Sequence, residues 1–369
     1  MHVKNTKPYI PKEDIDPILA DMKVALETGN LTFGDKLEEF ENNFASYTGT
    51  KYAVAVNSGT SALEASLRYY DLRGGEVIVP TNTFVASANA VIFAGGTPTM
   101  VDMDPTNLCA DFEDIKKSIS PRTKGIIIVP MCGYIPPYML ELKKLCKREN
   151  LFLLEDAAHA HGASIDGKKA GSIGDVGCFS FFPTKLMTTG EGGMVTTNNK
   201  ALADYVKQVR HHGQKNGLMT ELGYNWRMST INAIIGIHQL KRLDSFIEKR
   251  NEVAKKYSEA FKNIEEIELI EVPSNIVHGY WKHPILIKSK YTALEFHKIL
   301  KEKYNIDTGT VYYPPVHLQP YYKENFGYKE GDFPTSEKNL IREVCLPIFV
   351  DITDEQVDYV INCVKKELQ

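Results

Sequence analysis

The sequence predicts an α/β protein built on a buried, mostly parallel β-sheet. Short, continuous apolar runs recur through the first two-thirds of the chain, and stretches with a helical pattern separate them. Continuous apolar strands between helices are typical of a sheet that helices cover on both faces. The strands that we expect are residues 52–56, 76–80, 98–102, 125–130 and 151–155.

The residues around these strands predict the helices between them. The stretch ALEASLRYY follows the first strand, FVASANAVIFAGG follows the second, and YMLELKKLCKREN precedes the last. The second stretch closes on glycine, which ends helices because it adopts the left-handed backbone conformation easily. The alternation of strand and helix is typical of the α/β class.

The pattern changes after about residue 235. A long charged helical stretch, QLKRLDSFIEKRNEVAKKYSEAFKN, leads to HGYWKHPILIK and then to TALEFHKILKEKYN. We interpret this region as a connecting helix followed by a smaller α+β domain. The predicted division is a large domain at residues 1–245, which includes an N-terminal arm, and a small C-terminal domain at residues 246–369.

Composition and charge argue against several classes of protein. The 369 residues suffice for one large and one smaller domain. A net charge of −4 gives no electrostatic reason to expect nucleic acid or an anionic membrane as a partner. No apolar run approaches the ~20 residues that cross a bilayer, and the polar N-terminus does not resemble a signal peptide. The six cysteines lack zinc spacing, so we expect no metal site and reduced thiols in a cytoplasmic protein.

The first motif that could carry chemistry is AVNSGTSALEA at residues 55–65. A strand ends there, Gly59 permits a tight turn, and Thr60 and Ser61 can cap the helix that follows. Free backbone N–H groups and the helix dipole at such a point suit a phosphate. An ordinary helix cap explains the motif as well, and neither a Walker loop nor a GxGxxG fingerprint is present.

The second motif is LFLLEDAAHAHGA at residues 151–163, where an apolar strand ends in Glu155 and Asp156. A carboxylate at the C-terminal end of a buried parallel strand lies where α/β proteins bind ligands. A helix cap or a salt-bridged strand end is the alternative. We do not expect His159 and His161 to bind a metal, because no third ligand stands at helical spacing.

The third motif is FSFFPTKLMTTGEGG at residues 179–193, in which Lys185 follows an apolar run and a proline. Removal from water lowers the pKa of a lysine, and a neutral amine can form a Schiff base with an aldehyde. A lysine that extends to the surface is the alternative. Together, a phosphate cradle, a strand-end aspartate and a desolvated lysine are the parts that a pyridoxal 5′-phosphate site needs.

Seven stretches resemble, in chain order, the DegT/DnrJ/EryC1/StrS aminotransferases, often called sugar aminotransferases. They are NSGTSALEA, TFVASANAV, VDMDP, EDAAHAHGA, FSFFPTKLMTTGEGGMVTT, GYNWRMSTINAIIGIHQLKRLD and YYPPVHLQPYY. The resemblance implies a pyridoxal phosphate enzyme of fold type I, with a mixed, mostly parallel seven-stranded sheet in its large domain. It also implies a homodimer whose protomers share their active sites.

The resemblance implies a role for each matching residue. Lys185 would form the Schiff base and move a proton during transamination. Asp156 would pair with the pyridine nitrogen, and Phe84 would stack on the cofactor ring. The phosphate would be held by Gly59, Thr60 and Ser180 of one protomer. Asn225 would reach it from the partner subunit.

Two further residues are candidates for contacts with the substrates. Arg227 and His317 would bind the carboxylate of the amino donor or the sugar. For Arg227, a salt bridge at a subunit interface is an equal alternative.

The chain departs from the family pattern in three places. His159 stands where members commonly have the glutamine that contacts the cofactor's 3′-oxygen, and a neutral imidazole can donate there too. Met131 and Cys132 stand where a histidine often precedes a Gly-x-Pro turn, which leaves the substrate class open. The stretch HGYWKHPILI at residues 278–287 is an atypical form of the small-domain strand.

The resemblance predicts transamination with ping-pong kinetics. L-glutamate is the expected amino donor, and the expected acceptor is a nucleotide-linked 4-keto- or 3-keto-6-deoxysugar. A keto-inositol, a small phosphorylated ketone, a sugar dehydratase activity and a non-catalytic regulator are alternatives. Lys185 argues against the dehydratases that have histidine in its place, and the chain has no basic helix-turn-helix extension that would favour a regulator.

Overall fold

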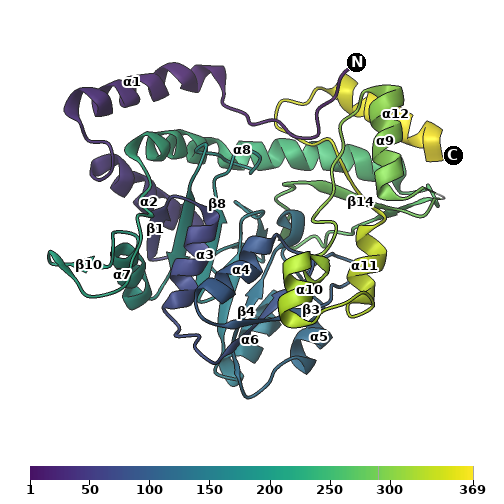
Figure 1. The fold of residues 1–369 in the computed structure, drawn as a ribbon. Helices are drawn as coiled ribbons and strands as arrows, with labels where there is room; N and C mark the ends of the chain where they lie inside the picture. The colour runs from purple at the N-terminus through teal and green to yellow at the C-terminus, as the bar shows by residue number, and fades with distance from the viewer. Residues whose placement is uncertain (290, 369) are drawn as a thin grey trace.

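The computed structural model describes residues 1–289 and 291–368 (Figure 1). A large α/β unit is built on one extended sheet, and a smaller unit near the C-terminus has its own sheet. The long helix α8 (Thr230–Phe261) runs from one unit to the other. In the described part of the chain, no helix is long and apolar enough to cross a membrane.

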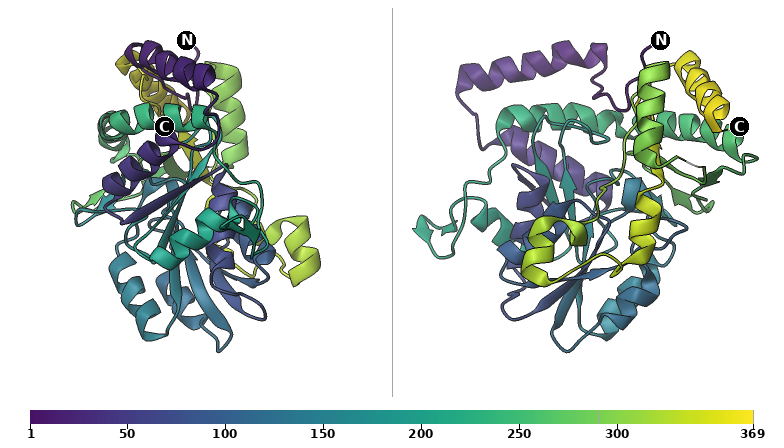
Figure 2. Two further views of the ribbon diagram at one scale, coloured as in Figure 1. Left: turned by 90° about the vertical axis from the view of Figure 1, so that its left-hand side faces the viewer. Right: turned by 45° about the vertical axis from the view of Figure 1, so that its right-hand side comes forward.

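The large unit is organised around a seven-stranded sheet, as predicted. Its strand order is β1-β9-β8-β5-β4-β2-β3; β9 is antiparallel to both neighbours and the other pairs are parallel. The five predicted apolar runs form strands of this sheet, whose two faces are covered by helices, whereas β8 and β9 are not among the predicted strands (Figure 2). The strands are β1 (Tyr52–Val56), β2 (Glu76–Pro80), β3 (Thr97–Val101), β4 (Thr123–Ile128), β5 (Phe152–Asp156), β8 (Val176–Ser180) and β9 (Gly193–Thr197).

The helices of the large unit connect these strands. Residues that satisfy free backbone N–H groups begin several of them: Ser58 caps α3 and Asn199 caps α7. The predicted caps of α3, Thr60 and Ser61, instead lie inside its first turn, because the N-cap is Ser58, two residues before Thr60. The helices are α2 (Asp35–Thr48), α3 (Gly59–Arg68), α4 (Val85–Phe93), α5 (Phe112–Lys117), α6 (Met139–Arg148) and α7 (Lys200–Val209).

The C-terminal unit is an antiparallel sheet packed against helices. Its strand order is β12-β14-β15, and its apolar side chains form a second hydrophobic cluster. Val3 belongs to this cluster and bridges to Ile306, so the N-terminus joins the C-terminal unit. The elements are β12 (Ile267–Leu269), β14 (His283–Ile287), β15 (Glu343–Leu346), α9 (Ala293–Tyr304) and α12 (Asp354–Leu368).

Helix α8 continues through residue 245, where the sequence analysis divides the domains. Ile247 packs in the cluster of the large unit, and Val253 packs in that of the C-terminal unit. We therefore propose that the two domains share α8, with the change of partner between these two residues.

An N-terminal helix of 17 residues and several short segments complete the described chain. Helix α1 (Lys12–Thr28) and the hairpin of β10 (Gln214–Lys215) and β11 (Leu218–Met219) expose several large apolar side chains. The remaining elements are η1 (Met131–Gly133), β6 (Ser164–Ile165), β7 (Lys168–Lys169), β13 (Ile276–Val277), η2 (Val316–Leu318), α10 (Pro320–Phe326) and α11 (Pro334–Leu340).

Candidate active site

A cavity of about 370 Å³ lies at the carboxyl edge of the large sheet, beyond the ends of β5 and β8. This edge is where α/β proteins bind ligands. Two walls come from beyond the large sheet, Trp281 just before β14 and Tyr312 after α9. Predicted site residues supply much of the rest: Gly59, Thr60, Phe84, Asp156, His159, Ser180 and Lys185.

The start of helix α3 forms one end of the cavity. Ser58 accepts a hydrogen bond from the Ser61 N–H at 3.1 Å, whereas among the described residues the N–H groups of Gly59 and Thr60 have no acceptor. A side chain at Gly59 would bring its Cβ within 2.7 Å of the Ser180 Cβ, so glycine is required by this close approach. The two free N–H groups and the helix dipole thus form a cradle suited to a phosphate.

Asp156, the last residue of β5, is buried at the floor of the cavity. Its Oδ2 accepts a hydrogen bond from Ser87 Oγ at 2.7 Å, and burial raises its pKa, although Ser87 and Lys185 act in the opposite direction. A buried carboxylate is stabilised by a cationic partner. The Asp156 side chain can therefore bind a protonated ring nitrogen.

The neighbouring Glu155 faces away from Asp156, because successive strand residues point to opposite sides of a sheet. Its carboxylate accepts hydrogen bonds from three backbone N–H groups, those of Gly171 at 2.8 Å, Ile173 at 2.7 Å and Gly174 at 2.6 Å. Glu155 therefore has a structural role, whereas Asp156 lines the cavity.

Lys185 follows β8 on a loop and presents part of its surface to the cavity. Burial lowers its pKa to about 8, although the Asp156 carboxylate acts to raise it. Its Nζ lies 4.1 Å from the centre of the Trp281 ring, and no described residue accepts a hydrogen bond from it. With this pKa, roughly a tenth of the amine is neutral at pH 7, far more than for an ordinary lysine, and the neutral form is the nucleophile.

His159 forms part of the cavity wall. Its ring is stacked on Trp281, with centroids 3.8 Å apart and an interplanar angle of 15°, and its Nε2 lies 2.7 Å from the Tyr312 hydroxyl. Burial lowers its pKa well below the usual value, so the ring is neutral. Its Nδ1 is buried without a partner among the described residues.

Trp281 and Tyr312 are site residues that the sequence analysis missed. Trp281 Nε1 donates to the Thr184 carbonyl at 2.8 Å, and its backbone N–H donates to the Cys132 carbonyl at 2.8 Å. Trp281 therefore connects the lysine loop to the turn after β4. The atypical form of residues 278–287 is the sequence signal that pointed to this segment.

Phe84 lies at the cavity mouth, where its side chain is 53% exposed and 5.6 Å from the Tyr312 ring. Asn225 is exposed and does not line the cavity of its own chain, and Arg227 Nη1 lies 2.9 Å from His211 Nδ1. His317 is fully buried, with its ring nitrogens 2.6 Å from Thr81 Oγ1 and 2.9 Å from Glu337 Oε1. The fold thus does not bring these last three predicted residues into the cavity.

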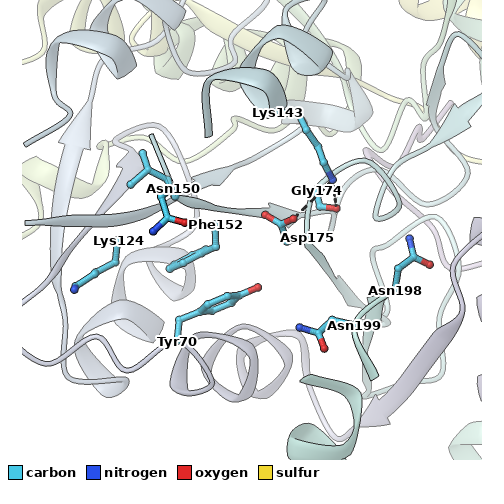
Figure 3. Close-up of a pocket in the computed structure, with 10 residues that line it drawn as sticks. Tyr70, Lys124, Lys143, Asn150, Phe152, Gly174, Asp175, Asn198 and Asn199 are labelled. Carbon is cyan, nitrogen blue, oxygen red and sulfur yellow. Dashed lines mark hydrogen bonds and ion pairs between the residues drawn. The ribbon is translucent and has the colours of Figure 1, made fainter. Parts of the chain in front are cut away.

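A larger depression, of about 610 Å³, lies at the amino edge of the same sheet (Figure 3). Its polar side chains mostly have structural partners. Lys143 Nζ donates to the Gly174 carbonyl at 2.8 Å, Asn199 caps α7, and Asn198 accepts a hydrogen bond from the Lys51 N–H at 2.9 Å. Volume alone therefore does not identify the functional cavity.

A mixed seven-stranded sheet with this cavity at its carboxyl edge is the architecture of the fold-type I aminotransferases. The chain belongs to the DegT/DnrJ/EryC1/StrS aminotransferase family, whose model matches residues 12–365. This family depends on pyridoxal phosphate. The protein is accordingly an enzyme that transfers amino groups, as the sequence predicts.

Named relatives cover nearly the whole chain. The spore coat polysaccharide biosynthesis protein SpsC of Bacillus subtilis is 36% identical, over 97% of this chain and 95% of its own length. A GDP-perosamine synthase of Escherichia coli is 37% identical, over 90% of each chain. The structure of DesV from S. venezuelae in complex with a ketimine intermediate superposes with a TM-score of 0.91 at 31% identity, covering 98% of this chain and 99% of that one.

Proposed function

We propose that this aminotransferase uses pyridoxal 5′-phosphate to move an amino group from L-glutamate to a keto-sugar carried on a nucleotide. One observation carries the proposal: Lys185, with a pKa lowered to about 8, shares a cavity with the Asp156 carboxylate and a free helix start. These are the groups that bind the aldehyde, the ring nitrogen and the phosphate of this cofactor.

Residues of the cavity match the groups of the cofactor one by one. The N–H groups of Gly59 and Thr60, with the hydroxyl of Ser180, would hold the phosphate. Asp156 would hold the ring nitrogen in its protonated form, and the free Nδ1 of His159 would face the ring oxygen. Phe84 would cover one face of the ring.

The bound cofactor would supply an electron-withdrawing ring that acidifies the α-carbon of the attached substrate. Lys185 would remove the proton at that carbon and deliver it to the cofactor carbon on the other side of the substrate nitrogen. Its lowered pKa suits this role, because a base works best when its pKa is near the working pH. One amine serves both directions of transfer, so we expect ping-pong kinetics.

The relatives support a sugar as the acceptor. One is named a GDP-perosamine synthase and another a spore coat polysaccharide biosynthesis protein. We propose a nucleotide-linked keto-deoxysugar as the acceptor, and a role in polysaccharide biosynthesis.

We further propose a homodimer with shared active sites. Asn225 is exposed outside its own cavity, and the hairpin near it exposes Leu218 and Met219 by 69% and 71%. Exposed apolar side chains of this kind are typical of surfaces that a second subunit covers. In the dimer, Asn225 would reach the phosphate in the cavity of the other protomer, and Arg227 would lie at the interface or near the substrate. The cytoplasmic location stays a prediction.

A screen of keto-sugars tests the acceptor. The purified enzyme is incubated with pyridoxal 5′-phosphate, L-glutamate and one ketone at a time, and release of 2-oxoglutarate is measured. The ketones include nucleotide-linked keto-deoxysugars, a keto-inositol and small phosphorylated ketones. We expect catalytic turnover with a nucleotide-linked sugar. Turnover with only a keto-inositol or a phosphorylated ketone would overturn the proposed acceptor. If L-glutamate does not lower the absorbance of the cofactor bound to Lys185, the proposed donor is wrong.

A further inference from the structure

His159 is held by two aromatic side chains from outside the large sheet. Trp281 is stacked on one face of its ring, and Tyr312 OH lies 2.7 Å from its Nε2. The Tyr312 ring lies 5.6 Å from the His159 ring at an interplanar angle of 21°. These contacts fix the plane of the imidazole and leave Nδ1 as its free nitrogen.

The backbone of Tyr312 is itself held in a rarely populated conformation. Its φ angle is 60°, in the left-handed region that residues with a side chain seldom adopt. The preceding residue, Val311, is fixed because its N–H donates to the buried Glu343 carboxylate at 2.6 Å. Strain that the surroundings maintain is found most often where a side chain must be placed accurately.

The charge states determine which atom donates in the Tyr312–His159 hydrogen bond. Burial lowers the pKa of His159 and raises that of Tyr312, so both groups are neutral. A phenol is a better donor than a neutral imidazole N–H, and an imidazole nitrogen is a better acceptor than a phenol oxygen. The hydroxyl of Tyr312 therefore donates to Nε2, and the proton of the imidazole resides on Nδ1.

We propose that Tyr312 is a positioning residue that fixes the tautomer of His159, so that the ring offers Nδ1–H as a donor, which would serve an anionic oxygen of the bound cofactor. The inference rests on the proposed function for the identity of that oxygen. Without the Tyr312 hydroxyl, the proton moves to Nε2, and Nδ1 then carries an acceptor lone pair in place of the donor. A glutamine at position 159 needs no such help, because its amide always offers a donor.

The tautomer is measured in the cofactor-free protein by nitrogen NMR of the histidine side chains, with H159Q identifying the His159 signals. We expect Nδ1–H in the natural protein, Nε2–H in Y312F and no change in Y321F, a control at an exposed tyrosine on α10. An Nε2–H tautomer in the natural protein, or no change in Y312F, overturns the inference. Because no cofactor is present, this result does not depend on the proposed function.

A second measurement compares cofactor affinity in two backgrounds. We expect Y312F to weaken binding of pyridoxal 5′-phosphate about tenfold, as for loss of one hydrogen bond to a charged group, when position 159 is histidine. In the H159Q background, we expect Y312F to leave the affinity for pyridoxal 5′-phosphate unchanged. Equal losses in both backgrounds would show that Tyr312 acts only on structure and would overturn the inference, whereas failure of the natural protein to bind the cofactor would overturn the proposed function.

Discussion

The two edges of the large sheet carry two cavities of different character. The amino-edge depression is larger, about 610 Å³ against about 370 Å³, but its polar side chains mostly have partners in the fold (Figure 3). At the carboxyl edge, Lys185 Nζ and His159 Nδ1 have none among the described residues. Unpaired nitrogens on side chains removed from water, and not volume, are therefore the reason for which we propose that this protein acts at the carboxyl edge. Each prediction below perturbs one of the two edges, and the paired lysine and aspartate variants compare them directly.

The largest contrast is expected between two lysines. Lys185→Ala should abolish covalent attachment of the cofactor and lower turnover by roughly 100- to 10,000-fold, since the nucleophile and proton carrier are lost. Lys124→Ala, at the amino-edge depression, should leave both near their natural values. Absorbance of the bound cofactor and release of 2-oxoglutarate measure the two effects. Comparable losses of turnover in Lys185→Ala and Lys124→Ala would contradict the different roles that we give to the two edges of the sheet.

A second contrast concerns pH. The pKa of Lys185 is about 8, and only the neutral amine attacks an aldehyde. The rate of cofactor attachment should therefore fall roughly tenfold per pH unit below about pH 8 and level off above it. In Asp156→Asn the midpoint should move to lower pH, because the carboxylate acts to raise this pKa. Stopped-flow absorbance across pH measures the profile, and a midpoint above pH ~10 would show an ordinary exposed lysine.

The same depressed pKa predicts a dependence of stability on pH. Between about pH 8 and the ordinary value of 10.5, the unfolded chain binds one more proton at this position than the folded chain does. The free energy of unfolding of the cofactor-free protein should therefore rise with pH across this window relative to Lys185→Met. Urea unfolding at several pH values tests the sign, and parallel curves for the two proteins would contradict it.

Two aspartates give a smaller contrast. Asp156→Asn should lower turnover by roughly 100-fold, because the charge that we propose keeps the cofactor ring protonated would be lost. Asp175 lies at the amino-edge depression, where its Oδ2 accepts a hydrogen bond from the Leu153 N–H at 2.8 Å. Asp175→Asn should leave turnover nearly unchanged. Steady-state kcat values decide the matter, and a larger loss in the second variant would reverse the assignment of the two edges.

The smallest effect is expected at Asn199, which caps α7 beside the amino-edge depression. Its Oδ1 accepts hydrogen bonds from the N–H groups of Ala201 at 2.9 Å and Leu202 at 3.3 Å. Asn199→Ala should lower the free energy of unfolding by about 1 kcal/mol without changing turnover. Urea denaturation measures the stability. A loss of turnover at unchanged stability would point to a function for this depression.

Much of the fold follows from the sequence because the strands are continuous apolar runs and their ends carry polar residues. Asp156 and Lys185 are predictable for this reason: each stands where an apolar strand gives way to a turn. The carboxyl ends of parallel strands meet at one edge, so residues distant in the chain come together there.

The rest depends on contacts that no local pattern encodes. Trp281 and Tyr312 enter the cavity from segments outside the large sheet, and their role emerges only when their rings meet His159. The polar residues of YYPPVHLQPYY suggested His317, yet the fold buries that ring and leaves Tyr312 at the cavity. The position of Asn225 relative to a second protomer likewise lies beyond what one chain determines.

Helix α8 has a consequence for how the protein melts. Its 32 residues extend about 48 Å, and opposite ends of this single rod pack in different hydrophobic clusters. Heat that loosens one cluster therefore frays the backbone that supports the other, so the two halves are expected to lose their structure in one cooperative transition. A break in the middle of the rod would separate that transition into two.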